Sequence, residues 1–467
     1  MNETIKFGTD GWRAIIAKEY TLDNLARVAE ATAQWLKKNN TAAAAVVGHD
    51  CRFGGEMFAG ATAVILAKAG IKVYLAKGFV STPMISLGTY NRKASAGIII
   101  TASHNPPEYN GYKIKAGYGG PATPAMIDEV EKLIPASAVV PSESVTEFIS
   151  KGLVEYIDLE AEYIAHAEKS FDIEAIRKSG LEIAYDAMYG AGQNVMRKLF
   201  PDATFLHCEH NPGFDGQAPE PVHKNLMELS ETIKLSGDID FGLATDGDAD
   251  RIGLYNSKGE FVDSHHIILL LINYLVNHKG YKGKVVVSFS CTDRIKDLCK
   301  HYGLEAVITK IGFKYICEIM VTDDVLVGGE ESGGIAIKGH IPERDGIWMG
   351  IALLEYMAKS GKSLEELIEE AYAIVGPFAM ERIDHHISEA QKQTVLTNCK
   401  QGNYKSFGQL NVEKVEDIDG WKFHLGNGEW VMIRASGTEP VLRTYCQAST
   451  SERAYEVLNI LADVILK

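Results

Sequence analysis

The sequence contains little cysteine, and the cysteines follow no recognisable framework. Seven cysteines in 467 residues leave at least one unpaired, and the closest pair, Cys291 and Cys299, lacks the spacing of a zinc site. A disulfide-stapled scaffold and a zinc module are therefore excluded. The thiols are expected to be reduced, which predicts a cytoplasmic protein.

Long apolar runs and an excess of positive charge are also missing. The longest strongly apolar stretch, residues 267–276, is about half as long as a membrane span. The first ten residues lack the charged-then-apolar pattern of an export signal. Asp and Glu outnumber Lys and Arg by 62 to 47, and the net charge of -15 repels a polyanion. We therefore expect neither a membrane nor a nucleic acid as a partner.

The phosphate-binding motifs of nucleotide enzymes do not occur. There is no G-x-x-x-x-G-K-[ST] and no complete G-x-G-x-x-G, so the signal for ATP- and NAD-dependent enzymes is lacking. What remains is a globular composition, with 46% hydrophobic and 23% charged residues. At about 150 residues per domain, the length allows roughly three or four domains.

Most of the chain alternates helix-like and strand-like segments. Residues 22–37 are amphipathic, residues 42–50 have the pattern of a buried strand, and residues 56–69 are helical. This alternation recurs until about residue 375 and predicts parallel βαβ units. We expect three related α/β domains with mixed sheets, at residues 1–150, 151–255 and 256–375.

The pattern changes after Gly376 and Pro377 to short strands joined by turns, with a hairpin signal at residues 426–428. Ser449 and Glu452 have the spacing of a capping box at the start of a final helix. The apolar residues that share one face of this helix are Ala454, Val457, Leu458, Leu461 and Ile465. Residues 376–467 are therefore predicted to form an α+β domain with an antiparallel sheet.

Each predicted α/β unit sends an apolar strand into a polar loop, and open α/β sheets bind ligands at such carboxyl ends. In the first loop, residues 101–113, two consecutive prolines stiffen the chain that follows Ser103 and His104. His104 and Lys113 are close enough in sequence to activate the Ser103 hydroxyl. The alternative is an ordinary Ser/Asn/Pro turn.

The second loop carries Asp246, Asp248 and Asp250. Carboxylates at i, i+2 and i+4 converge only if the backbone is extended or looped, and they repel one another unless a cation lies among them. The triad therefore predicts a Mg²⁺ site, with a solvated acidic turn as the alternative. An EF-hand fits poorly, because Arg251 stands where that loop requires glycine.

The third loop, residues 328–334, places Glu330, Glu331 and Ser332 between glycines. Glycines let the backbone approach a ligand closely, and these side chains suit sugar hydroxyls. A flexible turn without a ligand is the alternative.

The fourth loop, residues 434–443, has the donors of a phosphate cradle. The backbone N–H groups of Ser436, Gly437 and Thr438 can form an anion nest, and Arg434 and Arg443 add fork-shaped positive charge. A plain hairpin turn with surface arginines remains the alternative.

Together with F-G-T-D-G-W-R at residues 7–13, these loops in this order resemble the α-D-phosphohexomutase superfamily. The resemblance implies three related α/β domains and a fourth antiparallel one around a central cleft. It implies that Ser103 is the phosphorylated serine and binds Mg²⁺ with Asp246, Asp248 and Asp250. The implied reaction is an intramolecular phosphoryl transfer through a phosphoserine and a hexose 1,6-bisphosphate, which also serves as activator.

The resemblance also assigns roles to the cationic and polar residues. It implies that Lys113 lies beside the reacting phosphate. We expect Lys113 to be the general base, because burial beside cations would lower its pKa. The other implied groups are Arg13, His104 and Arg251 around the reacting phosphate, Glu330 and Ser332 on the sugar hydroxyls, and Arg434, Ser436, Gly437, Thr438 and Arg443 on the distal phosphate.

The sugar preference is inferred from the third loop and from residues near it. The G-E-E-S form resembles members that prefer glucose phosphates, and Phe313 stands where dual glucose/mannose members have histidine. Lys314 and Arg344 resemble phosphate or sugar contacts of the glucose branch. We therefore expect a phosphosugar enzyme, monomeric or homodimeric, that interconverts glucose 1-phosphate and glucose 6-phosphate.

Four alternatives stay open at this point. Within the superfamily, they are a phosphomannomutase and a phosphoglucosamine mutase. Outside the mutase reaction, they are a phosphatase that forms phosphoserine and a phosphosugar-binding protein without catalysis. Activity toward the three sugar 1-phosphates and release of inorganic phosphate distinguish them.

Overall fold

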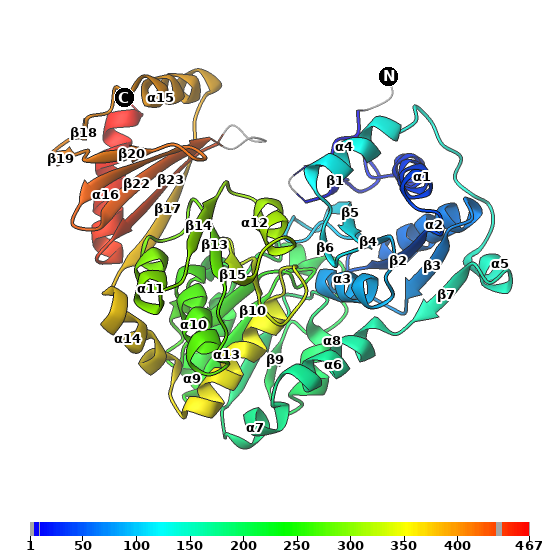
Figure 1. Cartoon of the computed structure of the whole chain (residues 1–467), viewed down its shortest axis with the longest axis horizontal. Helices are drawn as coiled ribbons and strands as arrows, with labels where there is room; N and C mark the ends of the chain where they lie inside the picture. Colours follow the sequence, from blue (N-terminus) through cyan, green and yellow to red (C-terminus); the bar gives the residue numbers. More distant parts are fainter. Residues whose placement is uncertain (1–3, 9, 436–440, 467) are drawn as a thin grey trace. The chain divides into compact units, whose positions relative to one another are not determined.

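The computed structural model describes residues 4–8, 10–435 and 441–466, and the chain separates into two compact units. Unit 1 comprises Met1–Val285 and Gly312–Ile368, and unit 2 comprises Val286–Ile311 and Glu369–Lys467. The course of the chain through its helices and strands can be followed by colour in Figure 1. Among the described residues, no helix is both long and apolar enough to cross a bilayer.

The first sheet of unit 1 has the strand order β1-β5-β4-β2-β3-β7, with β6 paired to β5. Strands β4, β2, β3 and β7 run parallel, whereas β5 is antiparallel to both β1 and β4, so the sheet is mixed. Its strands are β1 (Trp12–Ile15), β2 (Ala44–His49), β3 (Lys72–Ala76), β4 (Ala96–Ile100), β5 (Tyr109–Ala116), β6 (Gly120–Pro121) and β7 (Val154–Ile157).

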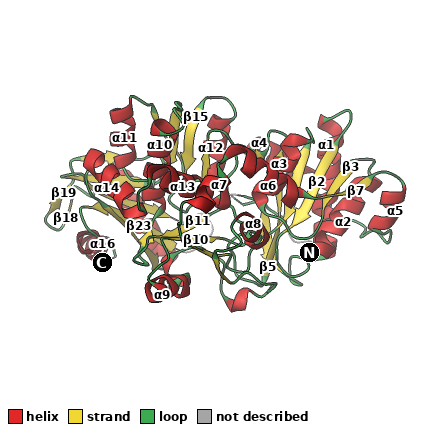
Figure 2. Ribbon diagram, turned by 90° about the horizontal axis from the view of Figure 1, so that it is seen from below, coloured by secondary structure: helices red, strands yellow, loops and turns green. Residues whose placement is uncertain are grey.

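Helices flank this sheet in the view of Figure 2. The chain steps outward from β2 to β3 and then back past β2 to β4, so right-handed crossovers place the two connecting helices on opposite faces. Residues 96–100 are consequently buried without exception. The helices of this region are α1 (Leu22–Asn39), α2 (Gly55–Lys68), α3 (Thr82–Asn91), α4 (Pro124–Leu133) and α5 (Val145–Ser150).

The second sheet of unit 1 has the order β12-β11-β10-β8-β9, parallel over β9, β8 and β10 and antiparallel beyond. Its strands are β8 (Ile183–Asp186), β9 (Thr204–Leu206), β10 (Phe241–Thr245), β11 (Ile252–Tyr255) and β12 (Phe261–Val262). The helices of this region are α6 (Leu159–Ser170), α7 (Ile173–Lys178), α8 (Gln193–Leu199) and α9 (Met227–Ser236), with short 3-10 turns η1 (Phe214–Gly216) and η2 (His223–Asn225).

A third α/β region is divided between the two units. In unit 1, β15 is antiparallel to β16, and the turn between them contains the third loop. The elements of the region are α10 (Ser264–Asn277), β13 (Lys284–Ser288), α11 (Arg294–Tyr302), β14 (Ala306–Thr309), α12 (Phe313–Met320), β15 (Val325–Gly329), β16 (Ile335–Ile337), α13 (Gly346–Ser360) and α14 (Leu364–Val375).

The C-terminal part of unit 2 is an antiparallel sheet of order β17-β23-β22-β21-β20. The predicted architecture of three mixed α/β regions followed by an antiparallel α+β region is thus confirmed. The elements are β17 (Ala379–His386), α15 (Glu389–Gln401), β18 (Ser406–Phe407), β19 (Leu410–Asn411), β20 (Lys414–Glu416), β21 (Trp421–Gly426), β22 (Glu429–Ala435), β23 (Val441–Ala448) and α16 (Ser451–Ile465).

The predicted hairpin and final helix are both present. Asn427 and Gly428 have positive φ angles of 51° and 76°, which the tight turn between β21 and β22 needs. All five apolar residues predicted for the inner face of α16 are buried. The cap prediction was wrong by one residue, because the side chain of Thr450, rather than that of Ser449, accepts the bond from the N–H of Arg453.

Candidate active site

Ser103 lies in the loop after β4 with a strained backbone. Its φ of 54° is in the left-handed region, which costs a non-glycine residue about 1–3 kcal/mol and persists only where the surroundings impose it. Its N–H donates to the Thr101 hydroxyl at 2.9 Å, and its own hydroxyl donates to Asp246 Oδ2 at 2.8 Å. The serine is 1% exposed, so its hydroxyl is directed at the second loop in a buried setting.

The three aspartates of that loop are fully buried and lie together. Each offers one carboxylate oxygen, and these oxygens are within 4.8 Å of one another. Asp246 Oδ1 accepts the N–H groups of Asp250 and Arg251 at 2.9 and 3.0 Å, which fixes the turn of the loop. Burial, and then the charges of Asp248 and Asp250, raise the pKa of Asp246 well above its ordinary value.

The carboxylates fit a divalent cation. Oδ1 of Asp248 and Oδ1 of Asp250 are buried and accept no hydrogen bond from any described residue. Buried oxygens of this kind are costly unless a positive group satisfies them. Because three hard oxygen ligands converge from one looped segment, the site suits Mg²⁺ or a similar ion.

Lys113 projects from β5 into the same cluster. Its Nζ lies 2.7 Å from Asp248 Oδ2, 3.1 Å from Asp250 Oδ2 and 3.0 Å from Asp10 Oδ2, and its side chain is fully buried. Burial alone would lower the pKa of Lys113, but the three carboxylates outweigh it and raise this pKa. The expectation of a lowered pKa was wrong, because carboxylates rather than cations face the ammonium group.

Arg344 completes the ion pairs on one side of the cluster. Its NH2 lies 2.7 Å from Asp250 Oδ2 and also contacts Asp10. Burial would raise the pKa of Asp10, but Lys113, followed by Lys115 and Arg344, holds it well below its ordinary value. Asp10 is therefore a carboxylate bridge between the first loop and the third α/β region.

The other predicted phosphate ligands belong to the Ser103 loop or contact it. His104 Nδ1 is 3.5 Å from the Ser103 hydroxyl, and its Nε2 is 3.4 Å from NH2 of Arg251. Arg13 donates to the side chain of Asn105 at 2.7 Å. Burial and the charge of Arg251 lower the pKa of His104 well below its ordinary value, so the imidazole is neutral at pH 7.

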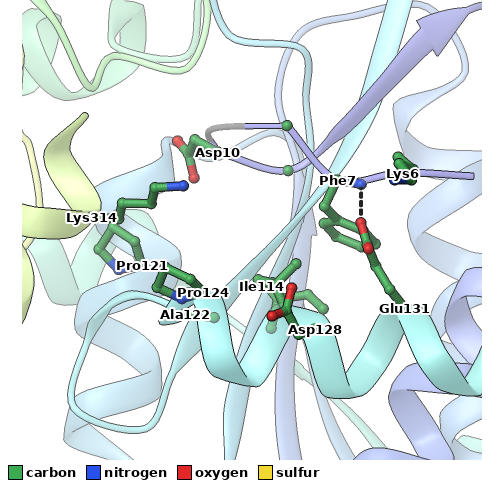
Figure 3. Close-up of a pocket in the computed structure, with 13 residues that line it drawn as sticks. Lys6, Phe7, Asp10, Ile114, Pro121, Ala122, Pro124, Asp128, Glu131 and Lys314 are labelled. Atoms are coloured by element: carbon green, nitrogen blue, oxygen red, sulfur yellow. Dashed lines mark hydrogen bonds between the residues drawn. The ribbon is translucent and has the colours of Figure 1, made fainter. Parts of the chain in front are cut away.

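The predicted sugar-binding residues of unit 1 differ in their surroundings. Glu330 is buried and accepts the N–H of Gly312 at 2.8 Å, and burial raises its pKa to about 7. Ser332 is partly exposed in the turn before β16. Lys314 and Asp10 line a pocket of about 190 Å³ beside β5 and α4, and the Lys314 side chain extends toward Asp10 (Figure 3).

The fourth loop belongs to unit 2. Arg434 lies 3.5 Å from Asp419, and Arg443 lies 3.6 Å from Asp384. Both arginines are on adjacent strands, where β22 and β23 pair. The predicted ligands Ser436, Gly437 and Thr438 lie outside the described residues.

Comparison with known proteins identifies the family of the chain. Models of the phosphoglucomutase/phosphomannomutase family match in four parts: domain I at residues 4–139, domain II at 161–259, domain III at 263–375 and the C-terminal domain at 396–464. The chain belongs to the phosphoglucomutase/phosphomannomutase family. It is thus a phosphohexomutase of carbohydrate metabolism, an isomerase that transfers a phosphoryl group within one sugar.

Relatives that match nearly the whole chain are named for different sugars. The chain is 29% identical to a phosphoglucomutase/phosphomannomutase of Thermococcus kodakarensis, over 97% of both chains. It is 28% identical to a phosphoglucosamine mutase of Carboxydothermus hydrogenoformans, over 99% of both. A crystal structure from Thermus thermophilus, described as that of a putative phosphomannomutase, has 32% identity, a TM-score of 0.88 and full coverage of both chains. Family membership therefore leaves the choice of sugar to be tested.

Several buried or half-buried residues of this candidate site were missed in the sequence. They are Asp10, Asp50, Arg52, Thr82, Lys115 and Glu343, all within unit 1 and all in contact with the residues above or their loops. Asp50 and Arg52 directly follow β2, at the carboxyl end of a parallel strand, and that position was a usable signal.

Proposed function

We propose that the protein interconverts glucose 1-phosphate and glucose 6-phosphate, with Ser103 as the phosphorylated residue. The observation that carries the proposal is the direct hydrogen bond from the strained Ser103 to Asp246 of the buried aspartate triad. A hydroxyl placed among carboxylates and cations fits reversible phosphorylation better than simple binding.

In the proposed reaction, the phosphoryl group of phosphoserine passes to the free O6 or O1 of a hexose monophosphate. The bond from phosphorus to Ser103 Oγ breaks, and a bond to the sugar oxygen forms, which gives hexose 1,6-bisphosphate. After the sugar turns over, its other phosphoryl group returns to Ser103. Each cycle regenerates the phosphoserine, so a hexose 1,6-bisphosphate is also the expected activator of an unphosphorylated enzyme.

Asp246, Asp248 and Asp250 are the proposed ligands of Mg²⁺, together with the phosphoserine at position 103. Held by these residues, such an ion would supply positive charge beside the transferring phosphoryl group. Arg13, His104 and Arg251 are proposed to bind the oxygens of that group, which is where most stabilisation of such a transition state arises.

Lys113 is the proposed general base for the attacking sugar hydroxyl. Its ammonium group is paired with Asp248, Asp250 and Asp10, so it can release a proton only when another positive charge neutralises those carboxylates. After transfer, the same ammonium can return the proton to the departing oxygen.

The remaining roles concern sugar orientation. Glu330, Ser332, Lys314 and Arg344 are proposed to contact the sugar or its phosphate. The distal phosphate is assigned to Arg434, Ser436, Gly437, Thr438 and Arg443 of the C-terminal domain. The four domains at residues 1–150, 151–255, 256–375 and 376–467, their arrangement around a central cleft, a monomeric or homodimeric state and a cytoplasmic location remain predictions.

Two measurements test the proposal. An intact-mass spectrum of the purified protein is expected to show a species heavier by one phosphoryl group, and Ser103→Ala is expected to lose both that species and nearly all turnover while remaining folded. A coupled assay then offers glucose, mannose and glucosamine 1-phosphates with a hexose 1,6-bisphosphate. A clear preference for mannose or glucosamine phosphate contradicts the glucose assignment, and steady release of inorganic phosphate without isomerised sugar indicates a phosphatase.

A further inference from the structure

Arg52 makes an unusual set of contacts with the Ser103 loop. Its NH1 donates to the carbonyl oxygens of Pro106 and Tyr109 at 2.8 and 2.9 Å. Its NH2 donates to the carbonyl oxygens of Ser103 and Asn105 at 2.7 and 2.5 Å. One buried guanidinium thus satisfies four backbone acceptors, among them the carbonyl of the serine itself.

The Pro106 carbonyl also accepts the N–H of Tyr109 at 3.1 Å, whereas the Ser103 carbonyl accepts no backbone N–H from the described residues and depends on Arg52. The loop between β4 and β5 has no regular secondary structure, and buried backbone carbonyls without a partner are costly. A guanidinium presents up to five N–H donors in a fixed plane, whereas a lysine ammonium has three donors around one point. Only arginine can therefore hold four carbonyls spread along seven residues of chain.

Arg52 is itself held in place from two sides. Asp50 Oδ1 accepts the backbone N–H of Arg52 at 2.9 Å, and Asp50 Oδ2 lies 3.4 Å from its Nε. The ring of Phe214, from the second α/β region, covers the guanidinium at 5.0 Å. The arginine side chain is fully buried, so its position is fixed before any ligand binds.

We propose that Arg52 is a positioning residue that holds Ser103 in its left-handed backbone conformation and so aims the hydroxyl at the aspartate triad. The inference rests on the proposed function of Ser103. Arg52 acts through the loop and does not touch the sugar. Replacing it is therefore expected to lower kcat strongly and to leave KM for the sugar phosphate unchanged.

Arg52→Lys is the test variant, because it keeps the charge and removes the planar fork. We expect kcat to fall by about 100-fold, the size of effect that a displacement of about 1 Å produces in a reacting group. The matched control is Arg27→Lys in the same domain. Arg27 is also buried and also donates to a backbone carbonyl, that of Pro135, which lies outside the Ser103 loop. The control is expected to keep the wild-type kcat.

Hydrogen exchange gives a readout that does not depend on activity. In Arg52→Lys, amides of residues 101–110 are expected to exchange faster, while exchange in the C-terminal sheet stays unchanged. If Arg52→Lys does not fold, Phe214→Leu leaves the arginine in place and is expected to lower kcat by about threefold through its weaker hold on the guanidinium.

The outcomes separate the two proposals. A wild-type protein without phosphoserine or mutase turnover refutes the proposed function, and the exchange data still report on the loop. A folded Arg52→Lys protein with wild-type kcat, or with exchange at residues 101–110 like that of the wild type, overturns the role of Arg52. Equal losses of kcat in Arg52→Lys and Arg27→Lys likewise overturn it.

Discussion

Lys115 and Glu343 form an ion pair whose two side chains are completely buried, with Nζ and Oε2 2.8 Å apart. We expect the losses in the free energy of unfolding caused by replacing each residue to be strongly non-additive. Lys115→Met removes the main cation from Glu343, which keeps two neutral donors, the Ser86 hydroxyl at 2.9 Å and the backbone N–H of Arg344 at 3.2 Å, and the Arg344 guanidinium at 3.9 Å. A buried charge that loses its partner costs about 3–5 kcal/mol.

Replacing Glu343 instead of Lys115 is expected to destabilise the protein less. Glu343→Gln leaves Lys115 with Asp10, whose Oδ1 lies 3.6 Å away, so we expect a cost near the lower end, about 3 kcal/mol. In the double variant both charges are gone, and well-packed neutral side chains often replace a buried pair without a net loss. The coupling energy of the cycle is therefore expected to approach the sum of the two single losses, about 6–8 kcal/mol.

The assay is native-state hydrogen exchange of the slowest amides in β5, because the chain has two units and a single unfolding midpoint would mix them. The exposed pair Lys178 and Glu174, an i,i+4 contact on α7, is the matched control and is expected to show little coupling. If the two losses add to within about 0.5 kcal/mol, the reasoning that each buried charge is stabilised mainly by the other is refuted.

Three further changes test separate parts of the molecule. Asp248→Asn is expected to raise sharply the Mg²⁺ concentration needed for half-maximal activity; an unchanged requirement would remove Asp248 from the ligand set. Asp186 raises the pKa of His207 to about 9, so this ion pair stabilises the fold fully below about pH 6.5 and is lost as the pH rises through 9; His207→Gln is expected to remove that part of the pH dependence of stability, measured by native-state hydrogen exchange in β8. Arg443→Gln is expected to raise KM for glucose 1-phosphate by about 10–100-fold, as the loss of a charged hydrogen bond predicts, and intact-mass spectra should still show phosphorylated Ser103.

Local signals made much of the fold predictable. The amphipathic pattern at residues 22–37 became α1, and the turn at Asn427 became a hairpin, because both patterns need only neighbours in sequence. The cap of α16 could not be placed from spacing alone. Ser449, Thr450 and Ser451 are adjacent and chemically equivalent as caps, and the backbone geometry of the chain entering the helix selects Thr450.

The candidate site could be predicted where its residues follow strands as distinct motifs, as Ser103 and the aspartates do, and their catalytic roles stay predictions. Lys115 and Glu343 gave no such signal, because each is buried only through a partner far away in the sequence. The prediction of a lowered pKa for Lys113 was wrong for the same reason. Its direction depends on which charges face the ammonium group, and Asp10 and Asp248 reach it from other parts of the chain.

The backbone at position 103 also restricts which hydroxyl side chain can occupy that position. With φ at 54°, a β-branched side chain would press its second γ-substituent against its own main chain, so threonine is disfavoured there although its hydroxyl accepts phosphate equally well. Asparagine and aspartate tolerate that geometry but offer no alcohol. The main chain therefore disfavours threonine at the residue proposed to carry the phosphate, and exchanging one hydroxyl amino acid for the other is not a conservative change in this loop.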